Sequence, residues 1–222
     1  MSYVEITASD GQAVGAYLAV PEATPRGGIV VIQEIFGVND HIRDVCDRLA
    51  GEGYAAIAPA IFDRQEKDFQ SGYTPEEIER ARAFIPGFDF DACMLDVEAA
   101  CRRVGEYGKV GMIGFCLGGT IAFLGATRIG AVSAASCYYG RLIQRFADET
   151  PKCPTQLHYA ALDVGIPPEN YEDVKARRPD AEFYLYEGAD HGFNCDRRPS
   201  YEPAAARLAW SRSRALFETN LA

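Results

Sequence analysis

Short apolar runs alternate along the chain with stretches whose apolar residues recur every three or four positions. Continuous apolar runs of this kind are typical of strands that are buried on both faces of a sheet. The runs expected to form such strands are 29–32, 54–58, 110–113, 131–139, 155–161 and 183–186. Two earlier strands, 4–7 and 13–20, flank Asp10-Gly11, a dipeptide typical of tight turns.

The segments between these runs carry the spacing and the capping residues of helices. Asn39 or Asp40 precedes a helix that extends to about residue 50, and Pro75 begins a helix with acidic residues in its first turn. Further helices are expected from Asp89 or Asp91 to 106, at 120–127, at 167–177 and through the apolar positions of 205–217. Residues 60–74 are expected to be irregular.

Strands that alternate with helices imply right-handed crossovers. The pattern therefore predicts an α/β fold with a doubly wound, mostly parallel sheet. Residues 1–222 contain no repeat, low-complexity segment or linker, so we predict one domain.

Composition narrows the possible partners. The net charge of −10 disfavours nucleic acid and anionic membranes. The seven cysteines show no CxxC spacing, so no zinc site or disulfide framework is expected, and nothing calls for a cofactor. The chain begins without a signal peptide pattern and has no apolar run of about 18 residues, so we expect a cytoplasmic protein, and a monomer.

The candidate chemistry begins at residues 114–119, GFCLGG, between an expected strand and an expected helix. In this context Gly-x-nucleophile-x-Gly forms a nucleophile elbow, in which a sharp turn presents the middle side chain at the edge of the sheet. Cys116 is then the nucleophile, and the following helix N-terminus favours its thiolate. The alternative is a tight turn around an inert, buried cysteine.

A cysteine nucleophile needs a base, and the chain has three histidines. His191 follows the last strand and is the expected base, whereas His41 is expected on a solvated helix face and His158 in the core. Asp163 follows the strand 155–161 and is the expected partner of His191; Asp190 is the rival, although an adjacent residue rarely reaches back to the imidazole. The order Cys116, Asp163, His191 is that of α/β-hydrolases.

Acyl transfer also needs donors for the developing oxyanion. We expect these to be the Leu117 N–H and the Ile35 N–H. Glu34 ends a buried strand and needs a partner there, either Arg43 in an ion pair or the Cys116 thiol.

Three segments, 33–39 (QEIFGVN), 114–119 (GFCLGG) and 188–193 (GADHGF), resemble the dienelactone hydrolase (carboxymethylenebutenolidase) family. The resemblance covers nearly the whole chain. It implies an α/β-hydrolase that opens a lactone or cleaves a small ester with a Cys116–His191–Asp163 triad. It also implies that Glu34 keeps the resting thiol neutral until substrate displaces it.

The sequence departs from the family at the two positions where the family has arginines that bind the substrate carboxylate. Cys195 occupies one such position, and Ile78 falls near the other. We expect Arg82 or Arg197 to replace this contact, Phe36 and Tyr139 to contact the small-molecule substrate, and the preference to shift toward less anionic lactones or esters. The alternatives are a general carboxylesterase or thioesterase, a non-catalytic binding protein on the same scaffold, and a redox sensor at Cys116.

Overall fold

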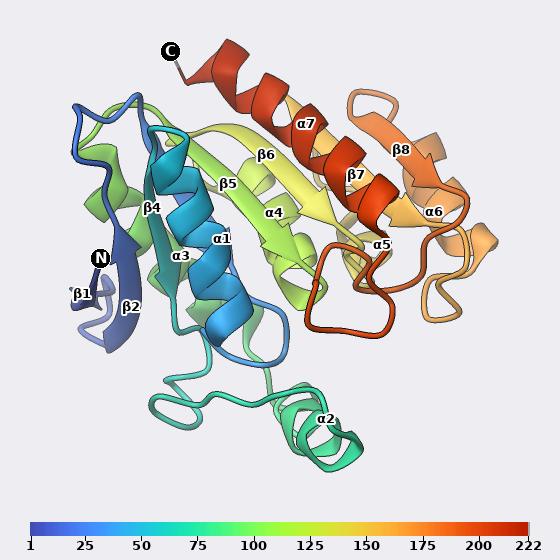
Figure 1. The fold of residues 1–222 in the computed structure, drawn as a ribbon, viewed down its shortest axis with the longest axis horizontal. Helices are drawn as coiled ribbons and strands as arrows, with labels where there is room; N and C mark the ends of the chain where they lie inside the picture. The colour runs from blue at the N-terminus through green and yellow to red at the C-terminus, as the bar shows by residue number, and fades with distance from the viewer. Residues whose placement is uncertain (222) are drawn as a thin grey trace.

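Eight strands form one sheet in the order β1-β2-β4-β3-β5-β6-β7-β8, in a computed structural model that describes residues 1–221 (Figure 1). β1 and β2 are antiparallel to their neighbours, and all pairs from β4 to β8 are parallel. The strands are β1 (Ser2–Thr7), β2 (Ala13–Ala19), β3 (Gly28–Ile32), β4 (Ala55–Pro59), β5 (Val110–Phe115), β6 (Val132–Tyr138), β7 (Thr155–Ala160) and β8 (Glu182–Tyr186).

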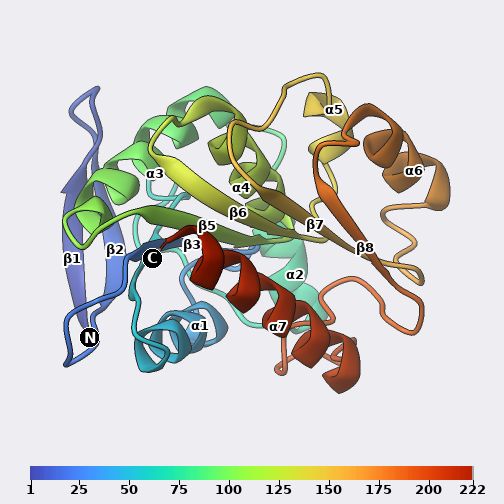
Figure 2. The same ribbon diagram turned by 90° about the horizontal axis from the view of Figure 1, so that it is seen from above.

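Helices cover both faces of this sheet. α1 and α7 lie on one face, and α3, α4, α5 and α6 lie on the other (Figure 2). Their bounds are α1 (Asp40–Gly51), α3 (Phe90–Gly105), α4 (Leu117–Arg128), α5 (Ile143–Phe146), α6 (Pro168–Arg177) and α7 (Pro203–Asn220). The predicted doubly wound, mostly parallel α/β sheet is confirmed.

The predicted elements and the observed ones differ mainly at their ends. α4 begins at Leu117, directly after Cys116, three residues before the predicted start. The short helix α5 was not expected, because four residues carry too little periodicity to be recognised. No helix within residues 1–221 has the length and hydropathy that a membrane span requires.

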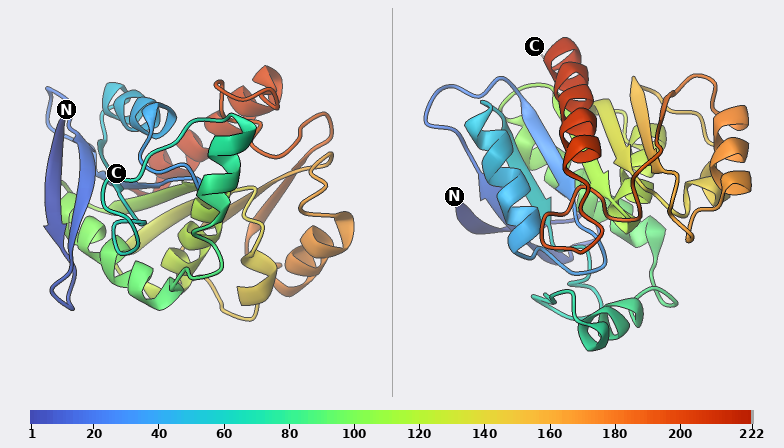
Figure 3. Two further views of the ribbon diagram at one scale, coloured as in Figure 1. Left: turned by 90° about the horizontal axis from the view of Figure 1, so that it is seen from below. Right: turned by 45° about the vertical axis from the view of Figure 1, so that its right-hand side comes forward.

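The helix α2 (Pro75–Arg82) lies apart from both helical layers, over the carboxyl ends of the parallel strands (Figure 3). A capping box at Thr74 and Glu77 fixes its start. Phe62, before α2, stacks on Phe84, after it, at a centroid distance of 4.8 Å. This contact holds together the two ends of the segment that contains α2. Residues 60–74, before α2, therefore lie over the end of the sheet where β3 and β5 finish (Figure 3).

A buried polar network lies under α7. His158 on β7 has its Nε2 3.1 Å from Ser136 Oγ and its Nδ1 2.8 Å from Tyr186 Oη, and Ser136 continues to Ser213 of α7 at 2.7 Å. Complete burial lowers the pKa of His158 to about 3. The imidazole is therefore neutral in the folded protein. His158 lies in the core, as predicted.

This network makes stability depend on pH in a predictable direction. Unfolded His158 takes up a proton below about pH 6.5, while the folded protein does not until about pH 3. We predict that His158 lowers the free energy of unfolding by about 2 kcal/mol between pH 6.5 and pH 5, since each pH unit contributes about 1.36 kcal/mol. Urea denaturation at both pH values should show a shallower pH dependence in His158→Gln than in wild type; equal dependences would contradict it.

Candidate active site

Cys116 occupies a strained turn between β5 and α4. Its φ of 56° and ψ of −113° place a non-glycine residue in a region that such residues rarely adopt. Gly118 and Gly119 allow α4 to come very close to the sheet at this turn. A Cβ on Gly118 would lie 2.3 Å from the Ile32 carbonyl oxygen, and a Cβ on Gly119 would lie 2.2 Å from the Tyr138 carbonyl oxygen. The Cys116 N–H donates to the same Tyr138 carbonyl at 3.1 Å. The Cys116 side chain remains partly exposed.

His191 and Asp163 form a short ion pair at the ends of β8 and β7. His191 Nδ1 lies 2.6 Å from Asp163 Oδ2. Asp163 is buried, and its other oxygen accepts the Gly165 N–H at 2.8 Å, so the carboxylate is fixed. Asp190 instead accepts the backbone N–H of His191 at 2.6 Å, which is a local loop contact.

The proton affinity of His191 is set by its two neighbours. Burial lowers its pKa, but the negative charge of Cys116 and the bond to Asp163 outweigh burial and raise the pKa to about 10. Cys116 is thus close enough to the imidazole for a strong electrostatic interaction. Tyr139, the expected substrate contact, packs against the His191 ring at a centroid distance of 5.1 Å and is fully buried.

The two amides expected to bind the oxyanion are those of Leu117 and Ile35. Leu117 is the first residue of α4, so its N–H has no acceptor within the helix. Ile35 follows β3, whose Ile32 pairs with Gly114 of the strand that leads to Cys116. Within residues 1–221 neither amide makes a hydrogen bond outside regular secondary structure. Their role as oxyanion donors stays a prediction.

Glu34 is almost completely buried, and Arg198 is its partner. Arg198 Nη1 lies 2.9 Å from Glu34 Oε1. The other oxygen, Oε2, has no hydrogen-bond partner within the described chain. The expected pairing with Arg43 is wrong, because that guanidinium contacts Asp40 and the Val38 carbonyl. No hydrogen bond joins Glu34 to the Cys116 thiol among the described residues, so the structure does not bring these two groups into the expected contact.

Arg198 is the functional candidate that sequence analysis passed over. Its guanidinium lies 5.8 Å from the ring centre of Phe36, and the charges of Glu34, Tyr139 and Cys116 outweigh burial to raise its pKa. The Arg198 guanidinium also lies against Gly192, the residue after His191, so that a Cβ on Gly192 would be 2.3 Å from Arg198 Nη1. The only signal in the sequence was its nearness to His191, which it shared with Arg197.

The two arginines that were expected to contact substrate lie elsewhere. Arg197 pairs with Asp44 on α1 at 2.6 Å and is half exposed. Arg82 is exposed on α2, where no described residue pairs with it. The structure therefore corrects the expectation: it brings Arg198 to the site in place of Arg82 and Arg197.

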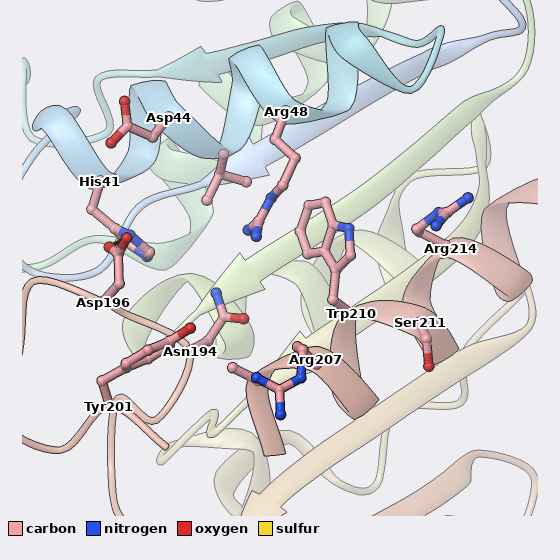
Figure 4. A pocket seen from close by; sticks show the side chains of 12 residues that line it. His41, Asp44, Arg48, Asn194, Asp196, Tyr201, Arg207, Trp210, Ser211 and Arg214 are labelled. Carbon is pink, nitrogen blue, oxygen red and sulfur yellow. Dashed lines mark ion pairs between the residues drawn. The ribbon is translucent and has the colours of Figure 1, made fainter. Parts of the chain in front are cut away.

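His41 also differs from its prediction. It was expected on a solvated helix face, but only 3% of it is exposed, and its ring packs edge-on against Phe115 at 6.0 Å. Loop 192–202 covers this part of α1, and His41 Nδ1 lies 3.7 Å from Asp196 Oδ1 (Figure 4). Periodicity along α1 could not show this, because the covering residues are about 150 positions away in sequence.

Comparisons with known proteins agree with this geometry. The family model described as "Dienelactone hydrolase family" matches residues 14–221. A Synechocystis sp. protein named "Putative carboxymethylenebutenolidase" is 39% identical, with 94% of this chain and 92% of that protein covered. One of the same name from Azospirillum brasilense is 36% identical, with both chains covered completely.

Similarity in structure leads to the same family. The crystal structure titled "Putative Dienelactone Hydrolase" from Klebsiella pneumoniae is 31% identical and superposes with a TM-score of 0.83, over 98% of this chain and 99% of that one. Together with the α/β-hydrolase fold and the elbow at Cys116, these matches show that the chain belongs to the dienelactone hydrolase family.

Proposed function

We propose that this protein opens a lactone or cleaves a small carboxylic ester by covalent catalysis at Cys116. The observation that carries the proposal is the position of His191. It is held by Asp163 at 2.6 Å on one side and interacts with Cys116 on the other. A nucleophile, a base and a group that orients the base are the parts that acyl transfer requires.

The first step is proton transfer within the pair. The raised pKa of His191, about 10, means that the imidazole can accept the thiol proton of Cys116 and hold it at neutral pH. The resemblance to the family implied a neutral resting thiol held by Glu34. Since Glu34 is paired with Arg198, we propose that His191 is the group that receives the thiol proton.

The thiolate then attacks the carbonyl carbon of the substrate. The carbonyl oxygen becomes an oxyanion beside the N–H groups of Leu117 and Ile35. As the tetrahedral intermediate collapses, the C–O bond breaks and His191 gives its proton to the leaving oxygen. Water, deprotonated by His191, then attacks the thioester, which releases the acid and restores Cys116.

Arg198 is the group that we propose binds a carboxylate on the substrate. A charge-assisted hydrogen bond holds it to Glu34, and a substrate carboxylate offers the same kind of acceptor. With a net charge of −10, the protein cannot attract anions over long distances, so local recognition by such an arginine is needed. Arg198 thereby compensates for the cysteine at position 195.

The choice of Asp163 over Asp190 can be tested by substitution. Asp163→Asn should lower kcat/KM for a small aryl ester roughly 10²–10⁴-fold, because the imidazole loses its orienting carboxylate. Asp190→Asn is the matched control and should cost less than about 10-fold, since it removes only a loop contact. Steady-state kinetics on both variants decide it. A larger loss in Asp190→Asn would place the acid at position 190.

The role of Arg198 can be tested with its neighbour as control. We predict that Arg198→Gln lowers kcat/KM on a free-acid lactone about 10- to 100-fold relative to the methyl ester of the same lactone, from the loss of one charge-assisted hydrogen bond. Arg197→Gln should leave this ratio unchanged. The ratio is insensitive to partial unfolding, because both substrates meet the same enzyme population. An unchanged ratio in Arg198→Gln would remove the arginine from substrate recognition.

A further inference from the structure

Three side chains outside the proposed triad converge beside it. Glu34, His41 and Cys195 are all buried, and each offers an oxygen, nitrogen or sulfur atom such that the three atoms lie within 4.8 Å of one another. They come from the end of β3, the first turn of α1 and the loop after β8. Carboxylate, imidazole and thiolate are the protein ligands of zinc.

Two of these groups have unused hydrogen-bonding capacity. Glu34 Oε2 and His41 Nε2 are both buried, and neither has a partner within residues 1–221. Each buried polar atom without a hydrogen-bond partner lowers the folding stability by about 1–3 kcal/mol. Two such atoms beside a buried thiol therefore call for an explanation.

From this geometry we propose that Glu34, His41 and Cys195 bind a divalent zinc ion. Zinc ligands at about 2.0–2.3 Å in tetrahedral geometry are separated from one another by roughly 3.5 Å. The three atoms need to close by little more than about 1 Å to reach that spacing. Three protein ligands leave the fourth position to water. As the Sγ–zinc bond forms, the Cys195 thiol proton passes to solvent.

The surroundings support ligands in these roles. Arg198 holds Glu34 through Oε1 and leaves Oε2 for the metal, and Asp196 lies 3.7 Å from Nδ1 of His41. A carboxylate beside a ligating imidazole commonly orients that ring from outside the coordination sphere. Tyr73, whose Oη is 3.3 Å from Cys195 Sγ, closes the remaining side.

Two cavities reach the His41 side of the cluster. His41 lines a cavity of about 390 Å³ between α1 and α7, next to Arg48 and Trp210 (Figure 4). It also lines a second cavity, of about 450 Å³, with Asn39 and Tyr73. The imidazole therefore lies between two openings, although little of its own surface is exposed.

Zinc binding would inhibit the hydrolase, a consequence that rests on the proposed function. A metal on Oε2 fixes Glu34 and its partner Arg198 in one position and places positive charge beside the group that should receive a substrate carboxylate. Binding itself is independent of catalysis. It can be measured in a protein that lacks the nucleophile.

The test uses Co²⁺ as a spectroscopic substitute for zinc, and zinc itself for affinity. Cys116→Ala should still show a thiolate-to-cobalt charge-transfer band and bind one Zn²⁺ by calorimetry. Adding Cys195→Ser to this variant should abolish the band and weaken zinc binding more than 100-fold, beyond the 10- to 100-fold typical of losing an outer partner. Adding Cys153→Ser instead is the matched control and should change neither.

A second ligand variant guards against misfolding. His41→Gln in the same background should also weaken zinc binding strongly, and circular dichroism verifies that each variant is folded. If the band survives Cys195→Ser, or disappears with Cys116→Ala alone, the metal is not at the proposed site and the proposal is overturned. Failure of the wild-type enzyme to hydrolyse lactones or esters would leave the binding result unaffected, so the two proposals fail separately.

Discussion

The close approach of α4 to the sheet is the constraint on which the site depends. Gly118 and Gly119 lie against the backbone carbonyls of Ile32 and Tyr138, where a Cβ would clash. This contact fixes the turn at Cys116 and sets a non-glycine residue at φ 56°. Strain of this kind costs about 1–3 kcal/mol and persists only where surrounding structure enforces it. Here the packing of α4, which is buried from Leu117 to Thr127, against β5 and β6 supplies that enforcement.

Once the turn is fixed, the parallel topology brings the other groups to it. Glu34, Asp163 and His191 each follow a different parallel strand, so their side chains meet at one edge of the sheet. Buried charged groups, such as Glu34 and Asp163, need partners of opposite charge. Asp163 compensates His191, and Arg198 compensates Glu34. Two ion pairs, His191–Asp163 and Arg198–Glu34, therefore hold the charged side chains of the site.

Most of the fold was predictable because its signals are local. Apolar runs located the strands of the sheet, and caps such as Asn39 and Asp89 located the helix starts. The pairing of His191 with Asp163 was predictable too, since strand ends in a parallel sheet share an edge. The partner of Glu34 was not, because Arg198 and Arg197 are adjacent and only the path of the loop decides which one points inward. Burial of His41 and its convergence with Cys195 likewise depend on contacts between distant segments.

The central claim is that Cys116 forms a covalent intermediate with its substrate. The most direct measurement is mass spectrometry of the protein after brief mixing with a slowly hydrolysed ester, followed by digestion and peptide mapping. We predict one added acyl group, located on the peptide that contains Cys116, which disappears as hydrolysis is completed. Turnover without an acyl adduct at Cys116, or an adduct on another cysteine such as Cys195, would contradict it.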